Sequence, residues 1–193
     1  ASRTERLRPW FARSSAVKVG ITRASQMPTR WIDQGATDAI VFARVPNRYT
    51  AGLVEVAMKE HLTDRTNWQR MLKNEVIDAD LVATKATLTG TLDADLQRFV
   101  DNDDTVCSID YPVNRYPEKV KSVGFDKHAE IEGCLAGIKG QYLIFDDNRV
   151  LNIRKHNGYR ITLTTWVCSS RTGIVLSSHP SGKIAASIDT PWT

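Results

Sequence analysis

Residues 16–22, AVKVGIT, place Val17, Val19 and Ile21 in alternation with polar or small residues. A side-chain period of two is typical of a strand that buries one face. A second short apolar run, PWFAR at 9–13, comes just before it. Two such runs so close together predict a β-hairpin. This hairpin constrains the fold, because the elements that follow must pack against its sheet.

The next segments alternate between helical and strand patterns. Residues 25–34 predict a short helix, because Pro28 suits only a first turn. Residues 38–45 are rich in β-branched and aromatic side chains and predict a third strand. A helical period returns at 46–62, where Asn47 is a candidate N-cap. We therefore expect an α+β fold in which helices flank a small three-stranded sheet.

The whole chain divides by pattern into five segments. A basic N-terminal arm at 1–8 precedes the first domain at 9–75, in which 64–73 adds a short helix. Residues 76–105 predict an acidic helical connector that breaks near Gly90. Strand patterns then predict a small β-rich domain at 106–166. The nearly uncharged, serine-rich segment 167–193 is expected to be a poorly ordered tail, with an edge strand through Gly173–Leu176 as the alternative.

Charge is unevenly distributed along the chain, whose net charge is +4. Residues 1–30 contain seven basic side chains and one acid, whereas 74–104 contain eight acids and two bases. A basic segment followed by an acidic one is typical of a protein that binds a polyanion through one face only. A solvated surface of mixed charge explains the same composition, so both interpretations stay open.

Composition also argues against a membrane protein and against a zinc-binding protein. Every apolar run is far shorter than the roughly 20 residues of a membrane helix, so we expect a cytoplasmic protein without a membrane partner. The cysteines lack C-x-x-C spacing and the four histidines are scattered. We therefore expect reduced thiols and no zinc site within this chain. The cysteines are Cys107, Cys134 and Cys168.

The motif Lys18-Val19-Gly20-Ile21-Thr22, with Arg30 on the next helix and Glu55 on a later one, resembles the GIY-YIG nuclease fold. The likeness is to the branch whose second signature reads K-[IV]-G-x-[TS]. It implies a divalent-metal-dependent endonuclease in which Arg30 grips the phosphate and Glu55 binds Mg²⁺ or Mn²⁺. Because Lys18 replaces a signature tyrosine, Tyr49, His61 or a lysine could transfer the proton instead, and Lys18 and Tyr49 are our candidates.

A closer likeness is to an uncharacterised bacterial family. It is carried by VKVGITR…PTRWIDQGA and GIKGQYLIF…VLNIRKHNGY and covers about residues 9–165. In that family a cysteine-rich, zinc-binding segment usually comes first, and this chain does not include it.

Three functions are compatible with these residues: a metal-dependent nuclease, an inactive nuclease fold that binds nucleic acid, and a protein-interaction scaffold. The choice between DNA and RNA and the oligomeric state also stay open. Gly20 either avoids a steric clash or lets a phosphate approach, and Glu55 either binds a metal or pairs with Lys59. The candidate nucleic-acid-binding cations are Arg13, Arg23, Lys139, Arg154 and Lys155.

Overall fold

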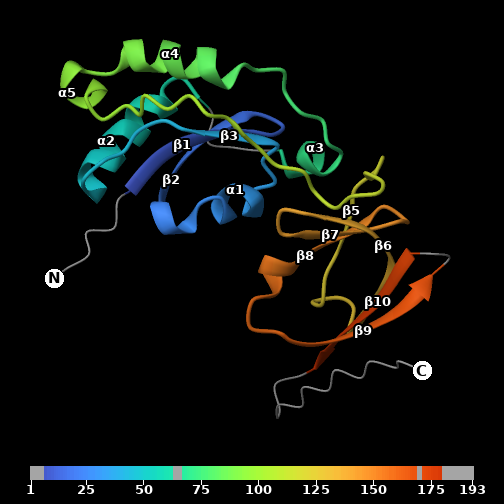
Figure 1. Cartoon of the computed structure of the whole chain (residues 1–193). Coiled ribbons are helices and arrows are strands. Elements are labelled where there is room, and N and C mark those ends of the chain that lie inside the picture. Colours follow the sequence, from blue (N-terminus) through green and yellow to red (C-terminus); the bar gives the residue numbers. More distant parts are fainter. Residues whose placement is uncertain (1–6, 63–66, 169–170, 180–193) are drawn as a thin grey trace. The chain divides into compact units, whose positions relative to one another are not determined.

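The computed structural model describes residues 7–62, 67–168 and 171–179 (Figure 1). They form a mixed α+β structure with one four-stranded and one six-stranded sheet. The chain divides into two compact units, Ala1–Asp110 and Tyr111–Thr193. Within the part that the structure describes, no helix combines the length and apolar character needed to cross a membrane.

The sheet of the first unit has the strand order β2-β1-β3-β4, and every neighbouring pair with a recorded register is antiparallel. Its strands are β1 (Leu7–Arg13), β2 (Val17–Arg23), β3 (Asp38–Val41) and β4 (Cys107–Ser108). The expected three-stranded sheet is therefore wrong, since β4 pairs with the start of β3. A strand of two residues is too short for a period of two to reveal it.

The helices of the first unit begin at the caps that the sequence provides. They are the 3₁₀ turn η1 (Ala24–Gln26), α1 (Thr29–Asp33), α2 (Arg48–Lys59), α3 (Trp68–Leu72), α4 (Leu81–Thr91) and α5 (Ala94–Gln97). Asn47 is confirmed as a cap, because its side chain accepts the Thr50 N–H at 2.8 Å. Asp80 likewise caps α4, which continues through Gly90 instead of breaking there.

The two faces of this sheet carry different helices. Phe11 of β1 packs in a buried cluster with residues of α2 and α4, among them Val54 and Leu88. The preceding Trp10 packs in another cluster with Trp31 of α1. Successive strand residues point to opposite faces, so α1 covers one face of the sheet while α2 and α4 cover the other (Figure 1). The segment expected to be a connector thus supplies part of the first core.

The second unit is built on a sheet with the order β5-β8-β7-β6-β10-β9. Its strands are β5 (Lys121–Val123), β6 (Glu130–Lys139), β7 (Tyr142–Phe145), β8 (Arg149–Asn152), β9 (Arg160–Cys168) and β10 (Arg171–His179). A 3₁₀ turn, η2 (Ile153–His156), follows β8. Only β5 and β8 are recorded as a parallel pair in this part of the structure.

The segment 167–193 differs from the expected poorly ordered tail where the structure describes it. Strand β10 lies between β6 and β9 and pairs with both. Ile174 and Leu176 are buried in the core of the unit with Phe145. Their alternation is a strand signal that the low charge and high serine content obscured. The rest of that segment, 169–170 and 180–193, lies outside the described residues, as do 1–6 of the basic arm.

Candidate functional site

The face of the first sheet that α1 covers, here called the α1 face, gathers three cations. In the β1–β2 register, Arg8 lies opposite Thr22, Trp10 opposite Gly20, and Ala12 opposite Lys18. Arg8 and Lys18 are two residues from the strand positions that pack toward α1, so they share its face. Arg30 lies on α1 itself.

Gly20 is explained by the side chain opposite it. A Cβ at position 20 would lie 2.6 Å from Cζ2 of Trp10, which is too close for any real contact. Trp10 is buried and meets Trp31 edge to face, with ring centroids 6.5 Å apart. The fixed indole therefore requires glycine in the neighbouring strand. This favours packing over the approach of a phosphate as the reason for Gly20.

Arg30 is half-buried near the start of α1. Its Nη1 lies 3.8 Å from Oδ2 of Asp33, and both side chains are 34% exposed. That separation is too long for a hydrogen bond, and exposed pairs of this kind contribute about 0–1 kcal/mol. The pairing therefore leaves the guanidinium donors of Arg30 able to bind a phosphate.

Glu55 lies on α2 and pairs with Lys59 one helical turn later, with 3.5 Å between Oε1 and Nζ. Because α2 covers the face opposite α1, the helices that carry Glu55 and Arg30 are on different sides of the sheet. Among the contacts of the described residues, none joins these two side chains. Tyr49 is also on α2 and is 75% exposed, so the structure groups it with Glu55 and not with Lys18.

The fit of Glu55 to a divalent cation can be judged from its neighbours. Mg²⁺ and Mn²⁺ prefer several oxygen ligands, and Glu55 offers one carboxylate that already faces the ammonium of Lys59. Within the described ranges, no three His, Cys, Asp or Glu side chains gather into a possible metal site. These residues do not fit the ion well, so no step through a metal is derived.

Two of the other candidate cations are engaged inside the protein. Arg13 donates to Asp38, with 2.6 Å between Nη2 and Oδ2, and to the carbonyl of Ala79 at 3.2 Å. Burial would raise the pKa of Asp38, but hydrogen bonds from Arg13, Ser108 and Thr37 outweigh it and hold that pKa below its usual value. Arg13 therefore belongs to the structural framework of the first unit.

Lys139 does not lie on the surface of the second unit, contrary to its expected role in nucleic-acid binding. Its side chain is buried, and its Nζ lies 5.4 Å from the ring centroid of Tyr111 and 5.2 Å from that of Tyr116. Burial lowers its pKa to about 8. The strand pattern of β6 does not show this, because lysine is rarely a core residue.

Arg23, Arg154 and Lys155 are exposed. Arg23 ends β2 and leads into η1. Arg154 and Lys155 lie on η2, where the Lys155 N–H donates to Oδ1 of Asn152 at 3.3 Å. Their two cations therefore form an exposed basic turn in the second unit.

Sequence reasoning missed Arg8, because the predicted basic N-terminal arm at 1–8 includes it. The structure starts β1 at Leu7, so Arg8 is a strand residue with the same orientation as Trp10. Extending the period of two backwards from Trp10 would have found it.

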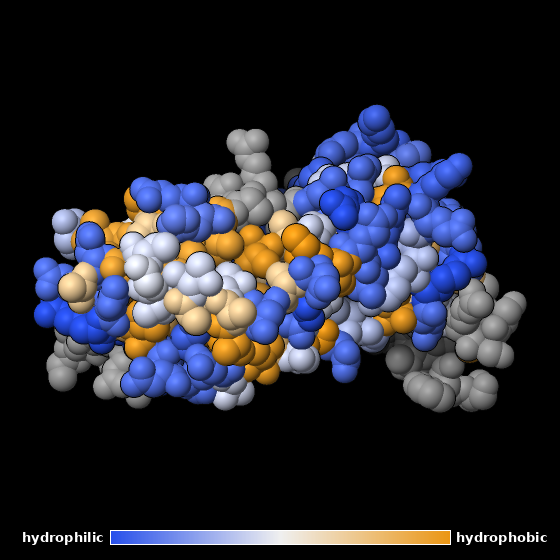
Figure 2. Space-filling view, turned by 90° about the horizontal axis from the view of Figure 1, so that it is seen from above, coloured by the Kyte–Doolittle hydropathy of each residue, from blue (hydrophilic) through white to orange (hydrophobic). Residues whose placement is uncertain are grey.

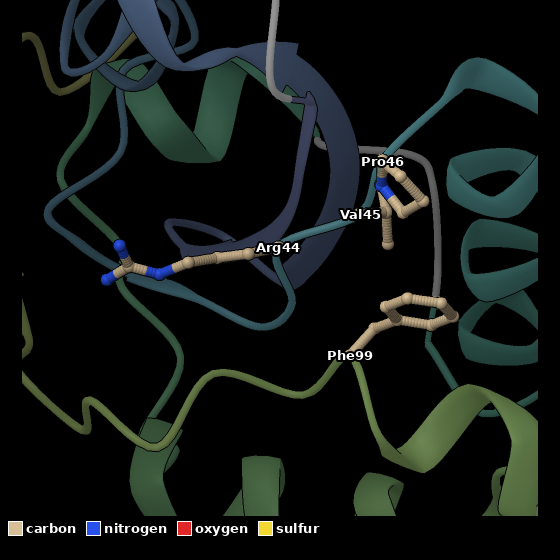
Figure 3. A pocket seen from close by; sticks show the side chains of 4 residues that line it. All are labelled: Arg44, Val45, Pro46 and Phe99. Carbon is tan, nitrogen blue, oxygen red and sulfur yellow. The ribbon is translucent and has the colours of Figure 1, made fainter.

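A cavity of about 280 Å³ in the first unit is lined by Arg44, Val45, Pro46 and Phe99. Figure 3 shows the guanidinium of Arg44 extending away from the rings of Pro46 and Phe99. That guanidinium pairs with Asp101. The other lining residues, Val45, Pro46 and Phe99, are apolar. None of the candidate nuclease residues lines this cavity.

The thiols differ from our expectation of three reduced cysteines. Cys107 is free, whereas Cys134 is disulfide-bonded. The expectation is therefore wrong for Cys134.

Comparison with known protein families identifies the family of this chain. A family model described as "Protein of unknown function (DUF2797)" matches residues 5–161. The chain belongs to the DUF2797 family. The DUF2797 match begins just before β1 and ends in β9, and it confirms the expected membership of an uncharacterised family. No curated protein and no solved structure matches the chain. The likeness to the GIY-YIG nuclease fold stays a prediction.

Proposed function

We propose that this DUF2797 chain binds nucleic acid through the α1 face without cleaving it. The observation that carries the proposal is that Lys18 and Arg30 belong to the same face of the sheet, together with Arg8. Asp33 is the acid that faces Arg30, at 3.8 Å. Cations that share one face are the feature that phosphate backbones require.

The distribution of acids supports the same face. On the opposite side, α2 carries Glu55 and ends at its cap Glu60, and Asp93 and Asp95 lie at the start of α5, whereas Arg48 and Lys59 of α2 balance two of these four acids. The balance of these residues is negative, so a polyanion is attracted less to that side than to the α1 face. The exposed turn with Arg154 and Lys155 offers a second set of phosphate contacts in the other unit.

The separation of Arg30 from Glu55 argues for binding over cleavage. Phosphodiester hydrolysis with one metal ion needs the phosphate-gripping cation and the metal-binding carboxylate at the same phosphate. Here their helices cover opposite faces, and Glu55 pairs with Lys59. A metal-dependent nuclease is therefore the second candidate, supported by the Lys18–Thr22 motif alone.

Fluorescence anisotropy with labelled single-stranded DNA, single-stranded RNA and duplex DNA tests the proposal. The double variant Lys18→Ala/Arg30→Ala is expected to bind roughly tenfold or more weakly, since two phosphate contacts are lost. The matched control, Arg48→Ala/Lys59→Ala, removes two cations from α2 and should bind within about twofold of the wild type. Equal losses in both variants, or no binding by the wild type, would overturn the proposal.

The same samples decide between binding and cleavage. Incubation with Mg²⁺ or Mn²⁺ is expected to leave each substrate intact on a denaturing gel. Cleavage that disappears in Glu55→Gln would instead establish the nuclease.

A further inference from the structure

Helix α2 has a second apolar stripe on the side away from the sheet. Its buried side carries Ala51, Val54 and Met58. Tyr49, Leu53 and Val56 are spaced i, i+4 and i+7 along the other side and are 75%, 41% and 62% exposed. A surface helix normally places polar residues opposite its buried stripe. Apolar residues that recur there at helical spacing indicate an interaction surface.

The stripe borders a groove between α2 and the segment that joins α4 to α5. The groove has a volume of about 660 Å³ and is lined by Leu53, Val56, Ala57, Glu60, Thr91, Asp93, Ala94, Asp95 and Leu96. Figure 2 views the molecule from the side of α4, where apolar and hydrophilic side chains are interspersed on the surface. A volume of this size accommodates a few apolar side chains of a bound segment.

The polar part of the groove has one sign of charge. Glu60, Asp93 and Asp95 are its ionisable lining residues, and no base is among the described residues that line it. Carboxylates around an apolar floor repel nucleic acid and attract an apolar segment that carries lysine or arginine. The occupant therefore differs from the ligand of the α1 face.

We propose that this groove, here called the α2–α5 groove, binds a basic amphipathic helix of a partner protein. Apolar side chains of the partner, three or four residues apart, pack on Leu53, Val56 and Leu96, as in other helix-in-groove complexes. Lysine or arginine side chains on the flanks of that helix meet the groove carboxylates. The helical occupant follows from the geometry, because Leu53, Val56 and Ala57 of one helix form a side of the groove, and Tyr49 extends the exposed apolar stripe of that helix beyond it.

The probe for the test is a fluorescein-labelled helical peptide of leucine and lysine, with leucines at i, i+3, i+4 and i+7. A leucine–glutamate peptide with the same leucine positions is its charge control. The full chain is expected to bind the lysine peptide and to bind the glutamate peptide at least tenfold more weakly. Similar binding of both peptides would mean non-specific apolar contact and would overturn the proposal, as would no binding.

Variants of exposed residues locate the site. Leu53→Gln/Val56→Gln should weaken binding of the lysine peptide at least tenfold. The control is Leu163→Gln, which changes an exposed leucine on β9 and should leave that binding unchanged. Glu60→Lys/Asp95→Lys should reverse the preference toward the glutamate peptide. Circular dichroism checks that each variant folds. Loss of binding in Leu163→Gln, or an unchanged preference after charge reversal, contradicts the proposal.

Two further readouts separate this proposal from other outcomes. Lys18→Ala/Arg30→Ala should retain peptide binding, so failure of nucleic-acid binding and failure of the groove are distinguishable. Analytical ultracentrifugation compares self-association of the wild type and Val56→Gln. We expect the wild type to show no self-association that depends on Val56. If it does, a second copy of the chain occupies the groove and the partner helix is excluded.

Discussion

The indole of Trp10 occupies the space that a side chain at Gly20 would need, directly across the β1–β2 hairpin. The same relationship recurs in the second unit, where Trp166 lies opposite Gly173 and its indole blocks a Cβ there. Glycine alone packs poorly in a strand, and a cross-strand aromatic ring compensates for it. In both sheets a tryptophan and a glycine thus act as one packing unit.

Replacement of Gly20 by alanine is expected to destabilise the first unit by about 1–3 kcal/mol, because the buried Trp10 ring cannot move aside freely. Gly90→Ala is the matched control: a Cβ there meets nothing within 4 Å, so alanine should stabilise α4 by about 0.5–1 kcal/mol. Urea unfolding followed by circular dichroism measures both. A stable Gly20→Ala variant that no longer binds nucleic acid would return Gly20 to the role of a phosphate-contacting residue.

The Arg13–Asp38 pair links β1 to β3, and Asp38→Asn is expected to cost about 1–3 kcal/mol at neutral pH. Because the pKa of Asp38 is lowered on folding, its contribution is present above the unfolded value near 3.8 and is lost as the pH falls through the folded pKa. As the pH falls through this range, the free energy of unfolding should therefore decrease more in the wild type than in Asp38→Asn, because asparagine does not titrate. Asp33→Asn, which breaks the loose pair with Arg30, should cost less than about 1 kcal/mol.

Lys139 should make the second unit more stable as the pH rises from about 8 to 10.5. Burial lowers its pKa from 10.5 to about 8, so in this interval the unfolded chain holds a proton that the folded chain has released. Lys139→Met should flatten that increase, whereas Lys121→Met, at an exposed position, should keep it. Urea midpoints at pH 7, 8, 9 and 10 provide the comparison. The same pH dependence in Lys139→Met and the wild type would show that Lys139 keeps its ordinary pKa.

Local features of the fold were predictable because they depend on neighbouring residues. The alternation of Val17, Val19 and Ile21 predicts β2, and Asn47 marks the start of α2. Strand β4 was missed because Cys107–Ser108 is too short to show a period. An edge strand through Gly173–Leu176 was the alternative to a poorly ordered tail, and the structure instead places β10 inside the sheet, where it pairs with β6 and β9.

The arrangement of the site was less predictable, because it depends on which face each helix covers. The sequence shows that Trp31 and Val54 are apolar, but not that one packs with Trp10 and the other with Phe11 on opposite faces. This choice separates Arg30 from Glu55. The burial of Lys139 is equally hidden, since its tyrosine neighbours come from the segment before β5.

The salt dependence of nucleic-acid binding tests the central claim most directly. The slope of log K against log salt concentration, measured by anisotropy with a single-stranded oligonucleotide, counts the phosphates that the protein neutralises. We predict a clear negative slope for the wild type, a slope shallower by about 1.4 for Lys18→Ala/Arg30→Ala, and no change for Arg48→Ala/Lys59→Ala. A flat wild-type slope, or the same slope in the wild type and Lys18→Ala/Arg30→Ala, would contradict nucleic-acid binding at the α1 face.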